Sequence, residues 1–296
     1  MLTGINMAFI GGDARMLEVV RCVCDLDASA DLYGYERAVI ELPDAHKREL
    51  TAAALAAADV VVLPVAGMDD DGNVGAAFAA SAIHLGEEHF AAISSGVPVF
   101  TGIAREGLAQ AAARHGLELI RLMEFDEVAI LNSIPTAEGA IALAMEHTDI
   151  TLHGSISVVI GMGRCGATLA RALHGLGADV RVVARKPADR ARIREMGLIA
   201  SDVDGLTGAV AQADVIFNTV PAPILTSDVL TCVRRDCVII DIASAPGGTD
   251  FRFAEKRGIK AILAPSLPGI VAPKTAGQII AQTLVRVVAQ TFTQRG

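Results

Sequence analysis

Residues 154–186 read GSISVVIGMGRCGATLARALHGLGADVRVVARK, and this stretch decides the fold. Its apolar run Ser157–Ile160 is typical of a strand that is buried on both faces. The sequence GMGRCG at 161–166 follows directly and matches the GxGxxG motif. An amphipathic helix at Ala167–Leu176 and a second strand at Asp179–Ala184 complete the unit. This order of strand, glycine turn, helix and strand predicts a Rossmann domain that binds a dinucleotide.

Each glycine of the motif has its own expected task. Gly161 permits the tight turn, Gly163 lets the backbone approach a pyrophosphate, and Gly166 lets the helix pack close to the strand. The helix N-terminus offers free N–H groups and the positive end of its dipole to the phosphates. The residues between the glycines complete the expected phosphate loop, and they are Met162, Arg164 and Cys165.

The end of the second strand indicates which dinucleotide is bound. NAD-specific sites hold an acidic residue there, about 20 residues after the first glycine, for the ribose 2′-hydroxyl. This chain has Ala184 at that place, followed by Arg185 and Lys186. Because a guanidinium pairs well with a phosphate, the sequence favours NADP over NAD. The alternative is that both cations are ordinary solvated residues at a strand end, and NAD use stays open.

Composition narrows the class of protein. The chain has 296 residues, of which 52% are hydrophobic, and a formal net charge of −9. This length fits two domains of roughly 100 to 200 residues each, and the acidic charge argues against a nucleic-acid partner. No apolar run reaches the roughly 20 uncharged residues of a membrane span, and no basic signal-peptide head is present, so a cytoplasmic location is expected. The five cysteines contain no CxxC spacing, and no metal site is expected.

Short apolar runs alternate with alanine-rich helical stretches in the first 125 residues. The alternation predicts a flavodoxin-like α/β domain over 1–125, with about five parallel strands and helices on both faces. The expected strands are Met7–Ile10, Asp31–Tyr33, Val60–Val65, Val97–Gly102 and Leu117–Leu122. The expected helices are Ala14–Leu26, Ala76–Ala92 and Arg105–His115.

The rest of the chain predicts a second doubly wound domain and two connecting helices. A helix over 126–150, interrupted near Pro135, leads into a Rossmann domain over 151–274 with strand order 3-2-1-4-5-6. A last helix over 275–296 is expected to return to the first domain. Because ligands of open α/β sheets lie outside the carboxyl ends of the strands, we expect the substrate between the two domains.

Polar residues after the first strand and in the bridging helix are the expected substrate contacts. Arg15 is expected to clamp a substrate carboxylate beside Asp13; the alternative is that Asp13 is only an N-cap and Arg15 a surface residue. The bridging helix places hydrogen-bonding side chains where a plain helix carries Ala or Leu. They are Asn132, Ser133, Thr136 and Glu138, and the alternative is a Thr136 cap with Glu138 in its first turn.

Strand-end loops of the second domain supply further candidates. Lys274 and Thr275 begin the last helix and are expected to face an anion. His147 and His153 lie beside the domain junction and are considered for acid or base chemistry, although a structural role is the alternative for each. The expected contacts of the nicotinamide end of the coenzyme are Asn218, Thr219, Val220, Pro221, Ala243 and Ser244.

Four segments resemble the dipicolinate synthase A subunits of spore-forming bacteria. They are ILNSIPTAEG at 130–139, HTDITLHG at 147–154, APGGTDF at 245–251 and APSLPGIVAPKTAG at 264–277. The resemblance runs essentially from end to end and is strongest after residue 125. It implies NAD(P)-dependent oxidation of dihydrodipicolinate, from the lysine branch, to dipicolinate during sporulation, in the mother-cell cytoplasm. It also implies a partner, the flavoprotein-like B subunit.

The reaction that the resemblance implies requires few catalytic groups from the protein. Loss of a hydride and a proton makes a dihydropyridine ring aromatic, so a hydride acceptor and modest base assistance are needed. Glu138, His153 and Lys274 are the catalytic candidates, and water is the alternative base. Two other classes stay open. One is a generic 2-hydroxy-acid or amino-acid dehydrogenase, although its usual set of His, Arg and Glu is missing from the last two strand-end loops. The other is a non-catalytic protein that only binds the dinucleotide. A homo-oligomer also stays open.

Overall fold

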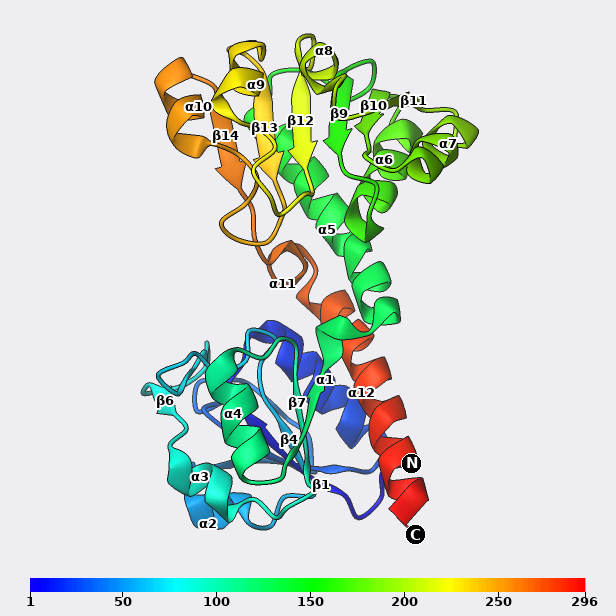
Figure 1. Cartoon of the computed structure of the whole chain (residues 1–296). Coiled ribbons are helices and arrows are strands. Elements are labelled where there is room, and N and C mark those ends of the chain that lie inside the picture. The colour runs from blue at the N-terminus through cyan, green and yellow to red at the C-terminus, as the bar shows by residue number, and fades with distance from the viewer. Residues whose placement is uncertain (296) are drawn as a thin grey trace. The chain divides into compact units, whose positions relative to one another are not determined.

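The computed structural model describes residues 1–295, with side chains through Thr293. The chain forms two compact units. The N-terminal unit comprises Met1–Ala129 and the C-terminal residues from Ala272 on, and the Rossmann unit comprises Ile130–Val271. Each unit holds one six-stranded parallel sheet between two layers of helices (Figure 1). The predicted class of two parallel-sheet α/β domains is confirmed.

The sheet of the N-terminal unit has the order β3-β2-β1-β4-β7-β8. The five predicted strands keep the flavodoxin-like order within it, and β3 adds an edge strand that was not predicted. Its sequence Ala-His-Lys-Arg has no apolar alternation, which is why no strand pattern marks it. The strands are β1 (Asn6–Ile10), β2 (Ser29–Tyr33), β3 (Ala45–Arg48), β4 (Val60–Val62), β7 (Pro98–Thr101) and β8 (Glu118–Arg121).

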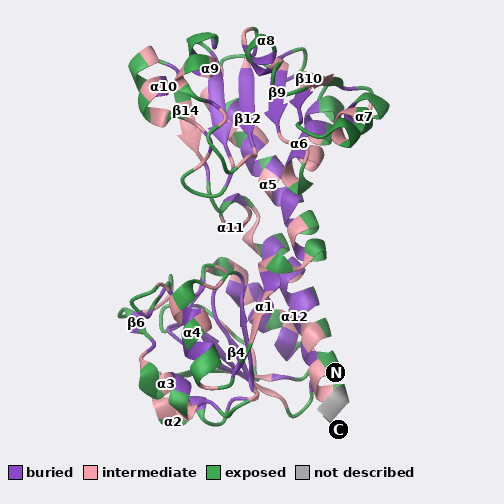
Figure 2. Cartoon of the chain, viewed as in Figure 1, coloured by how far each residue is buried: buried purple, intermediate pink, exposed green. Residues whose placement is uncertain are grey.

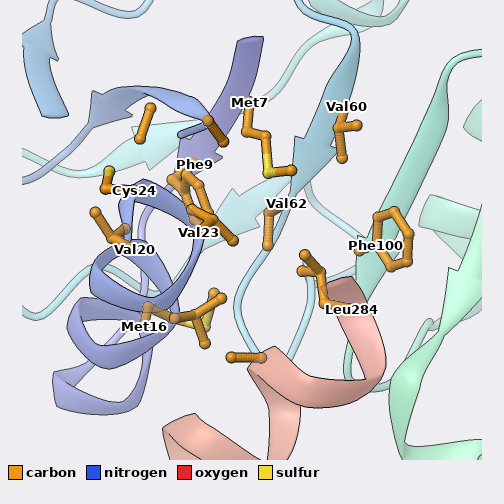
Figure 3. Packing of buried hydrophobic residues seen from close by; sticks show 14 of the residues in the cluster. Met7, Phe9, Met16, Val20, Val23, Cys24, Val60, Val62, Phe100 and Leu284 are labelled. Atoms are coloured by element: carbon orange, nitrogen blue, oxygen red, sulfur yellow. The ribbon is translucent and has the colours of Figure 1, made fainter. Parts of the chain in front are cut away.

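Helices cover both faces of this sheet because its strands are apolar on both sides. Met7 and Phe9 pack with the first and last helices of the chain (Figure 3). Ala8 and Ile10 pack with the helices between. The first group is α1 (Ala14–Cys24) and α12 (Pro273–Arg295). The second group is α2 (Ala52–Leu55), α3 (Glu87–Ala92) and α4 (Glu106–Arg114), and the 3-10 turn η1 (Leu122–Glu124) follows β8.

The predicted helix Ala76–Ala92 is wrong over most of its length, because only α3 at its end is helical. The segment before α3 instead carries a two-stranded hairpin, β5 (Asn73–Val74) and β6 (Ile83–His84). Gly12 N–H donates to the Gly75 carbonyl at 2.8 Å, and Ala77 N–H donates to the Gly12 carbonyl at 2.8 Å. These tertiary backbone bonds override the helix propensity of the alanines.

The Rossmann unit has the predicted doubly wound order, β11-β10-β9-β12-β13-β14. All five neighbouring pairs are parallel. The strands are β9 (Ile156–Ile160), β10 (Asp179–Val183), β11 (Ile199–Ser201), β12 (Val215–Asn218), β13 (Val238–Asp241) and β14 (Lys260–Leu263). Their side chains are mostly buried, whereas the outer helix faces are exposed (Figure 2). The helices are α6 (Arg164–Gly175), α7 (Pro187–Glu195), α8 (Leu206–Val210), α9 (Ser227–Thr231), α10 (Phe251–Arg257) and α11 (Leu267–Val271).

Helix α5 (Asp126–His147) is continuous through Pro135, where an interruption was expected. Proline removes one backbone donor from the helix. Hydroxyl groups on either side bond the neighbouring carbonyls, Ser133 Oγ to Ile130 at 2.6 Å and Thr136 Oγ1 to Asn132 at 2.7 Å. The alternative of a new helix capped by Thr136 is therefore wrong as well.

By length and composition alone, α5 could cross a membrane. This is weak support for a span, because the core helix of a folded domain passes the same test. Ala137, Ala140 and Ala144 are buried in the Rossmann core beside α6 and the sheet. The structure therefore uses α5 as a core helix of this unit.

Candidate functional site

The glycine turn after β9 is open at one position only. A Cβ on Gly161, whose φ is +102°, would overlap the Thr219 hydroxyl, and a Cβ on Gly166 would overlap the Gly161 carbonyl oxygen. A Cβ on Gly163 would meet nothing within 4 Å. Gly163 is the N-cap of α6 and provides no capping side chain. The backbone is thus exposed where a pyrophosphate is expected, and these residues fit a dinucleotide.

Strand β12 braces this turn from the neighbouring position in the sheet. Thr219 Oγ1 donates to the Ile160 carbonyl at 2.8 Å, and Thr219 N–H donates to the same carbonyl at 3.0 Å. Asn218 is fully buried, and its side chain bonds the Val220 N–H and carbonyl, each at 3.1 Å. Asn218, Thr219 and Val220 therefore shape the turn, while Pro221 is exposed beyond them.

A buried carboxylate orders the next strand-end loop, and no motif marked it in the sequence. Asp241 is fully buried at the end of β13. Its oxygens accept from Asn218 Nδ2 at 3.0 Å and from the backbone N–H groups of Ala243 and Gly248 at 3.1 and 2.9 Å. Thr249 Oγ1 donates to it at 2.6 Å. Four donors compensate its burial and hold the loop that carries Ala243 and the exposed Ser244. The signal available in the sequence was an acid at a strand end followed by Gly247-Gly248.

Three cations gather at the end of β10. Ala184 is buried, whereas Arg185 and Lys186 are exposed. Among the described residues, no carboxylate forms an ion pair with Arg185 or Lys186. Arg190 of α7 donates from one guanidinium nitrogen to the carbonyls of Ala184 at 3.1 Å and Arg185 at 2.7 Å. The sequence motif did not include Arg190.

The remaining loop residues flank the open glycine. Met162 is half-buried against the core, Arg164 is exposed, and Cys165 is half-buried at the start of α6. Burial raises the pKa of the Cys165 thiol, and the neighbouring Arg164 lowers it by less. Cys165 is therefore a protonated thiol at neutral pH rather than a reactive thiolate.

In the N-terminal unit, Arg15 is already paired with Asp13. Arg15 Nη2 lies 2.6 Å from Asp13 Oδ2, and Arg15 Nε lies 3.0 Å from Asp13 Oδ1. Asp13 also caps α1 by accepting from Arg15 N–H at 3.0 Å. Burial raises the pKa of Asp13, but the hydrogen bonds and charge of Arg15 outweigh it and hold this pKa below the usual value. Arg15 is largely buried, so the alternative of a plain surface residue is wrong, whereas the N-cap role of Asp13 is confirmed.

The start of α12 lies beside the start of α1 within the same unit. A Cβ on Gly277 would overlap the Arg15 carbonyl, and Gln278 Nε2 donates to Glu18 Oε1 at 2.9 Å. Lys274 and Thr275, in the first turn of α12, are exposed. Lys274 and Thr275 therefore begin the helix whose next turn packs on the backbone of Arg15.

The polar residues of α5 serve packing more than a ligand surface. Ser133 is buried, and its hydroxyl lies 2.7 Å from Thr168 Oγ1 of α6. Thr136 uses its hydroxyl on the Asn132 carbonyl, and Asn132 itself is buried. The hydroxyls of Ser133 and Thr136 thus bond groups within the Rossmann unit, while Glu138 is exposed.

His153 lies at the wrong end of the sheet for coenzyme chemistry. It precedes β9 and packs against Gly177, which precedes β10. The glycine turn follows the opposite end of β9, roughly 15 Å away along a five-residue strand. His147 likewise contacts Lys260, the first residue of β14, at 3.1 Å. These contacts favour the structural alternative for His153 and His147.

The chain is similar to known proteins over nearly its whole length. Residues 6–123 match the family model for the N-terminal domain of the dipicolinate synthase A subunit. Residues 136–246 match the family model for the NAD binding domain of D-isomer specific 2-hydroxyacid dehydrogenase, so the open glycine turn lies in a domain for a nicotinamide dinucleotide. The dipicolinate synthase A subunit of Bacillus subtilis (strain 168) is 43% identical over 269 residues, covering 91% of each chain.

Two solved structures agree with this likeness. The dipicolinate synthase A subunit from Bacillus halodurans has a TM-score of 0.95 and 42% identity, covering 98% of this chain and 99% of that one. The corresponding structure from Bacillus subtilis has a TM-score of 0.93 and 43% identity, covering 99% of each chain.

Proposed function

The chain belongs to the family of dipicolinate synthase A subunits, and on this premise we propose that it catalyses the NADP-dependent oxidation of dihydrodipicolinate to dipicolinate. One observation carries the proposal. In a chain that matches this family over 91% of its length, the phosphate turn of the Rossmann unit is open at Gly163 and has no capping side chain. The fold does not require open space at this turn, whereas a bound dinucleotide does, because its pyrophosphate approaches the backbone there.

The residues of the Rossmann unit divide the task of holding the coenzyme. Gly161, Gly163 and the start of α6 would receive the pyrophosphate, and Arg185 and Lys186 would receive the 2′-phosphate of NADP. The Asn218–Asp241 network orders the two loops expected at the nicotinamide end. When bound, the coenzyme supplies a hydride acceptor.

Cations of the N-terminal unit would bind the dianionic substrate. Arg15 is held in one orientation by Asp13, and the exposed Lys274 and Thr275 begin α12, whose Gly277 packs on the Arg15 carbonyl. A pre-ordered guanidinium loses little entropy when it binds a carboxylate. The exposed Glu138 remains the proposed base, with water as the alternative, because loss of one proton from a ring that becomes aromatic needs modest assistance.

A generic 2-hydroxyacid dehydrogenase is the second candidate, because residues 136–246 match that NAD-binding domain. The strand-end loops 218–226, 241–250 and 264–272 contain no His, Arg or Glu. Acid–base reduction of a 2-keto acid needs such groups near the substrate. The composition of these loops therefore favours the dihydropyridine reaction. A non-catalytic protein that only binds the coenzyme stays as a third class.

The Bacillus subtilis relative is by name one component of an enzyme with more than one kind of chain, which supports assembly with a B subunit. We infer a flavoprotein-like B partner and a cytoplasmic location in the mother cell of a sporulating bacterium, both implied by the family. Binding to a protein partner requires no cluster of basic residues, and the chain has a net charge of −9.

The decisive experiment follows dipicolinate absorbance in the ultraviolet from dihydrodipicolinate generated in situ. The chain is tested alone and with the B subunit, and with NADP⁺ or NAD⁺. Product with this chain alone, faster with NADP⁺, is the expected result. Product only with both chains would move the active unit to the complex. Absence of product in every arm would overturn the proposal and bring the generic dehydrogenase forward.

A further inference from the structure

A side chain outside the glycine motif closes the turn that follows β10. Arg190 lies on α7, and its Nη1 donates to two consecutive carbonyls, Ala184 at 3.1 Å and Arg185 at 2.7 Å. Arg190 N–H also donates to the Lys186 carbonyl at 3.1 Å, within the first turn of the helix. One residue thereby engages three consecutive carbonyls at the place where the adenosine ribose is expected.

This clamp fixes the backbone that carries the two exposed cations. An arginine keeps its charge at any working pH, and its planar group loses little further freedom once bonded. With the carbonyls of Ala184 and Arg185 held, the backbone under Arg185 and Lys186 is ordered before any ligand arrives. Ordering in advance removes a cost that binding would otherwise carry.

The charge around the turn suits a phosphate. Asp189 lies in the first turn of α7, and Asp202 follows β11, where its Oδ1 accepts from Gly205 N–H at 2.9 Å. In the part of the chain that the structure describes, neither acid forms an ion pair with Arg185, Lys186 or Arg190. Three cations against these two acids leave a net positive charge at the end of β10.

We propose that Arg190 is a positioning residue that sets the preference for a 2′-phosphorylated adenosine by holding Arg185 and Lys186 in place. The proposal rests on the proposed NADP function. It goes beyond that function because the specificity depends on a helix residue that contributes backbone order, and not only on the two cations of the strand end.

The test compares two probes that differ only in the 2′-phosphate, adenosine 2′,5′-bisphosphate and adenosine 5′-monophosphate. Calorimetric titration of the full chain gives both affinities without any turnover. Arg190→Met keeps the aliphatic stem and removes the donors. Arg192→Met is the matched control, because Arg192 lies on the same helix but pairs with Glu195 at 2.9 Å. Arg190→Lys tests rescue by a shorter donor.

We expect Arg190→Met to weaken the bisphosphate about tenfold and the monophosphate less than about twofold. Arg190→Lys should restore most of the bisphosphate affinity, and Arg192→Met should change neither. Equal losses for both probes, or no loss, would overturn the role of Arg190. If the unaltered chain itself binds both probes equally, the NADP assignment fails first, and the role of Arg190 falls with it.

Discussion

The two sheets have the same strand order, but the space around the glycine turn after the first strand differs between them. In the Rossmann unit, a Cβ on Gly163 would stand in open space. In the N-terminal unit, a Cβ on Gly12 would overlap Met16, and Gly12 N–H donates to the Gly75 carbonyl at 2.8 Å. The same topology therefore leaves one turn free for a ligand and fills the other with its own chain. Binding follows from the space at the turn and not from the fold.

Aromatic residues secure the filled turn. The buried Tyr35 hydroxyl donates to the Gly11 carbonyl at 2.7 Å, and its ring stacks on Phe78 with centroids 6.2 Å apart. Phe78 belongs to the segment that replaces the expected helix. This segment occupies the edge of the N-terminal sheet where the Rossmann sheet would receive phosphates, so we expect the two turns to respond differently to the same change.

Gly12→Ala should have the largest effect. Gly12 has φ +124°, which alanine avoids, and the new Cβ would overlap Met16. We expect a loss of about 3 kcal/mol in the stability of the N-terminal unit. Hydrogen exchange should accelerate in β1 and remain unchanged in β9, with coenzyme affinity of the folded chain within about twofold. Faster exchange in β9 as well would show that the two units do not unfold independently.

Gly163→Ala should act on binding and spare stability. Gly163 has φ −78°, an ordinary value for alanine, and open space around it. The stability of the Rossmann unit should change by less than about 1 kcal/mol, whereas coenzyme affinity should fall about 100-fold because the methyl group stands in the pyrophosphate path.

Gly175→Ala is the matched control for this change, since Gly175 lies on the same helix and also has nothing within 4 Å. It should leave coenzyme affinity unchanged. Unaltered affinity in Gly163→Ala would remove the phosphate turn from the proposed site.

Two half-buried thiols offer a smaller contrast. Burial raises the pKa of Cys165 in the open turn, and burial with the charges of Glu18 and Asp25 raises the pKa of Cys22 on α1. We expect saturating NADP⁺ to slow alkylation of Cys165 about tenfold and to leave Cys22 unchanged, measured by mass spectrometry of iodoacetamide-treated peptides. Equal protection of both thiols would point to general tightening of the chain instead of contact at the open turn.

The sequence predicted those elements whose own residues carry the signal. The Rossmann order follows from periodic apolar strands and the glycine motif, and the cations at Arg185 and Lys186 are adjacent in the chain. The clamp by Arg190 depends on a helix side chain that meets the end of β10 only after folding, so no strand-end motif marks it. The loop around Asp241 had a weak signal in the sequence, an acid at a strand end followed by two glycines, but its bond to Asn218 forms only in the folded sheet. The position of His153 before β9 could be read from the sequence, because the strand begins where it was predicted to begin.

The helices after the two turns differ in what neutralises their first amide groups. Helix α1 carries the Asp13 carboxylate, whereas α6 begins at Gly163 and has no side-chain cap. Asp13→Asn keeps a good cap and removes the charge that faces both Arg15 and the start of α1, so it tests the smallest of these effects. Because Asp13 is 43% exposed, the charge should contribute less than about 1 kcal/mol.

The lowered pKa of Asp13 determines how the stabilisation by its charge changes with pH. The stabilisation is fully present above the usual carboxyl value of 3.8, and it is lost as the pH falls through the lower folded pKa. The unaltered chain should therefore exceed Asp13→Asn in stability at pH 7, and the difference should shrink toward pH 3 when hydrogen exchange of β1 is corrected for intrinsic rates. A difference that is constant with pH, or one that grows toward pH 3, would show that the charge of Asp13 beside Arg15 does not stabilise the N-terminal unit.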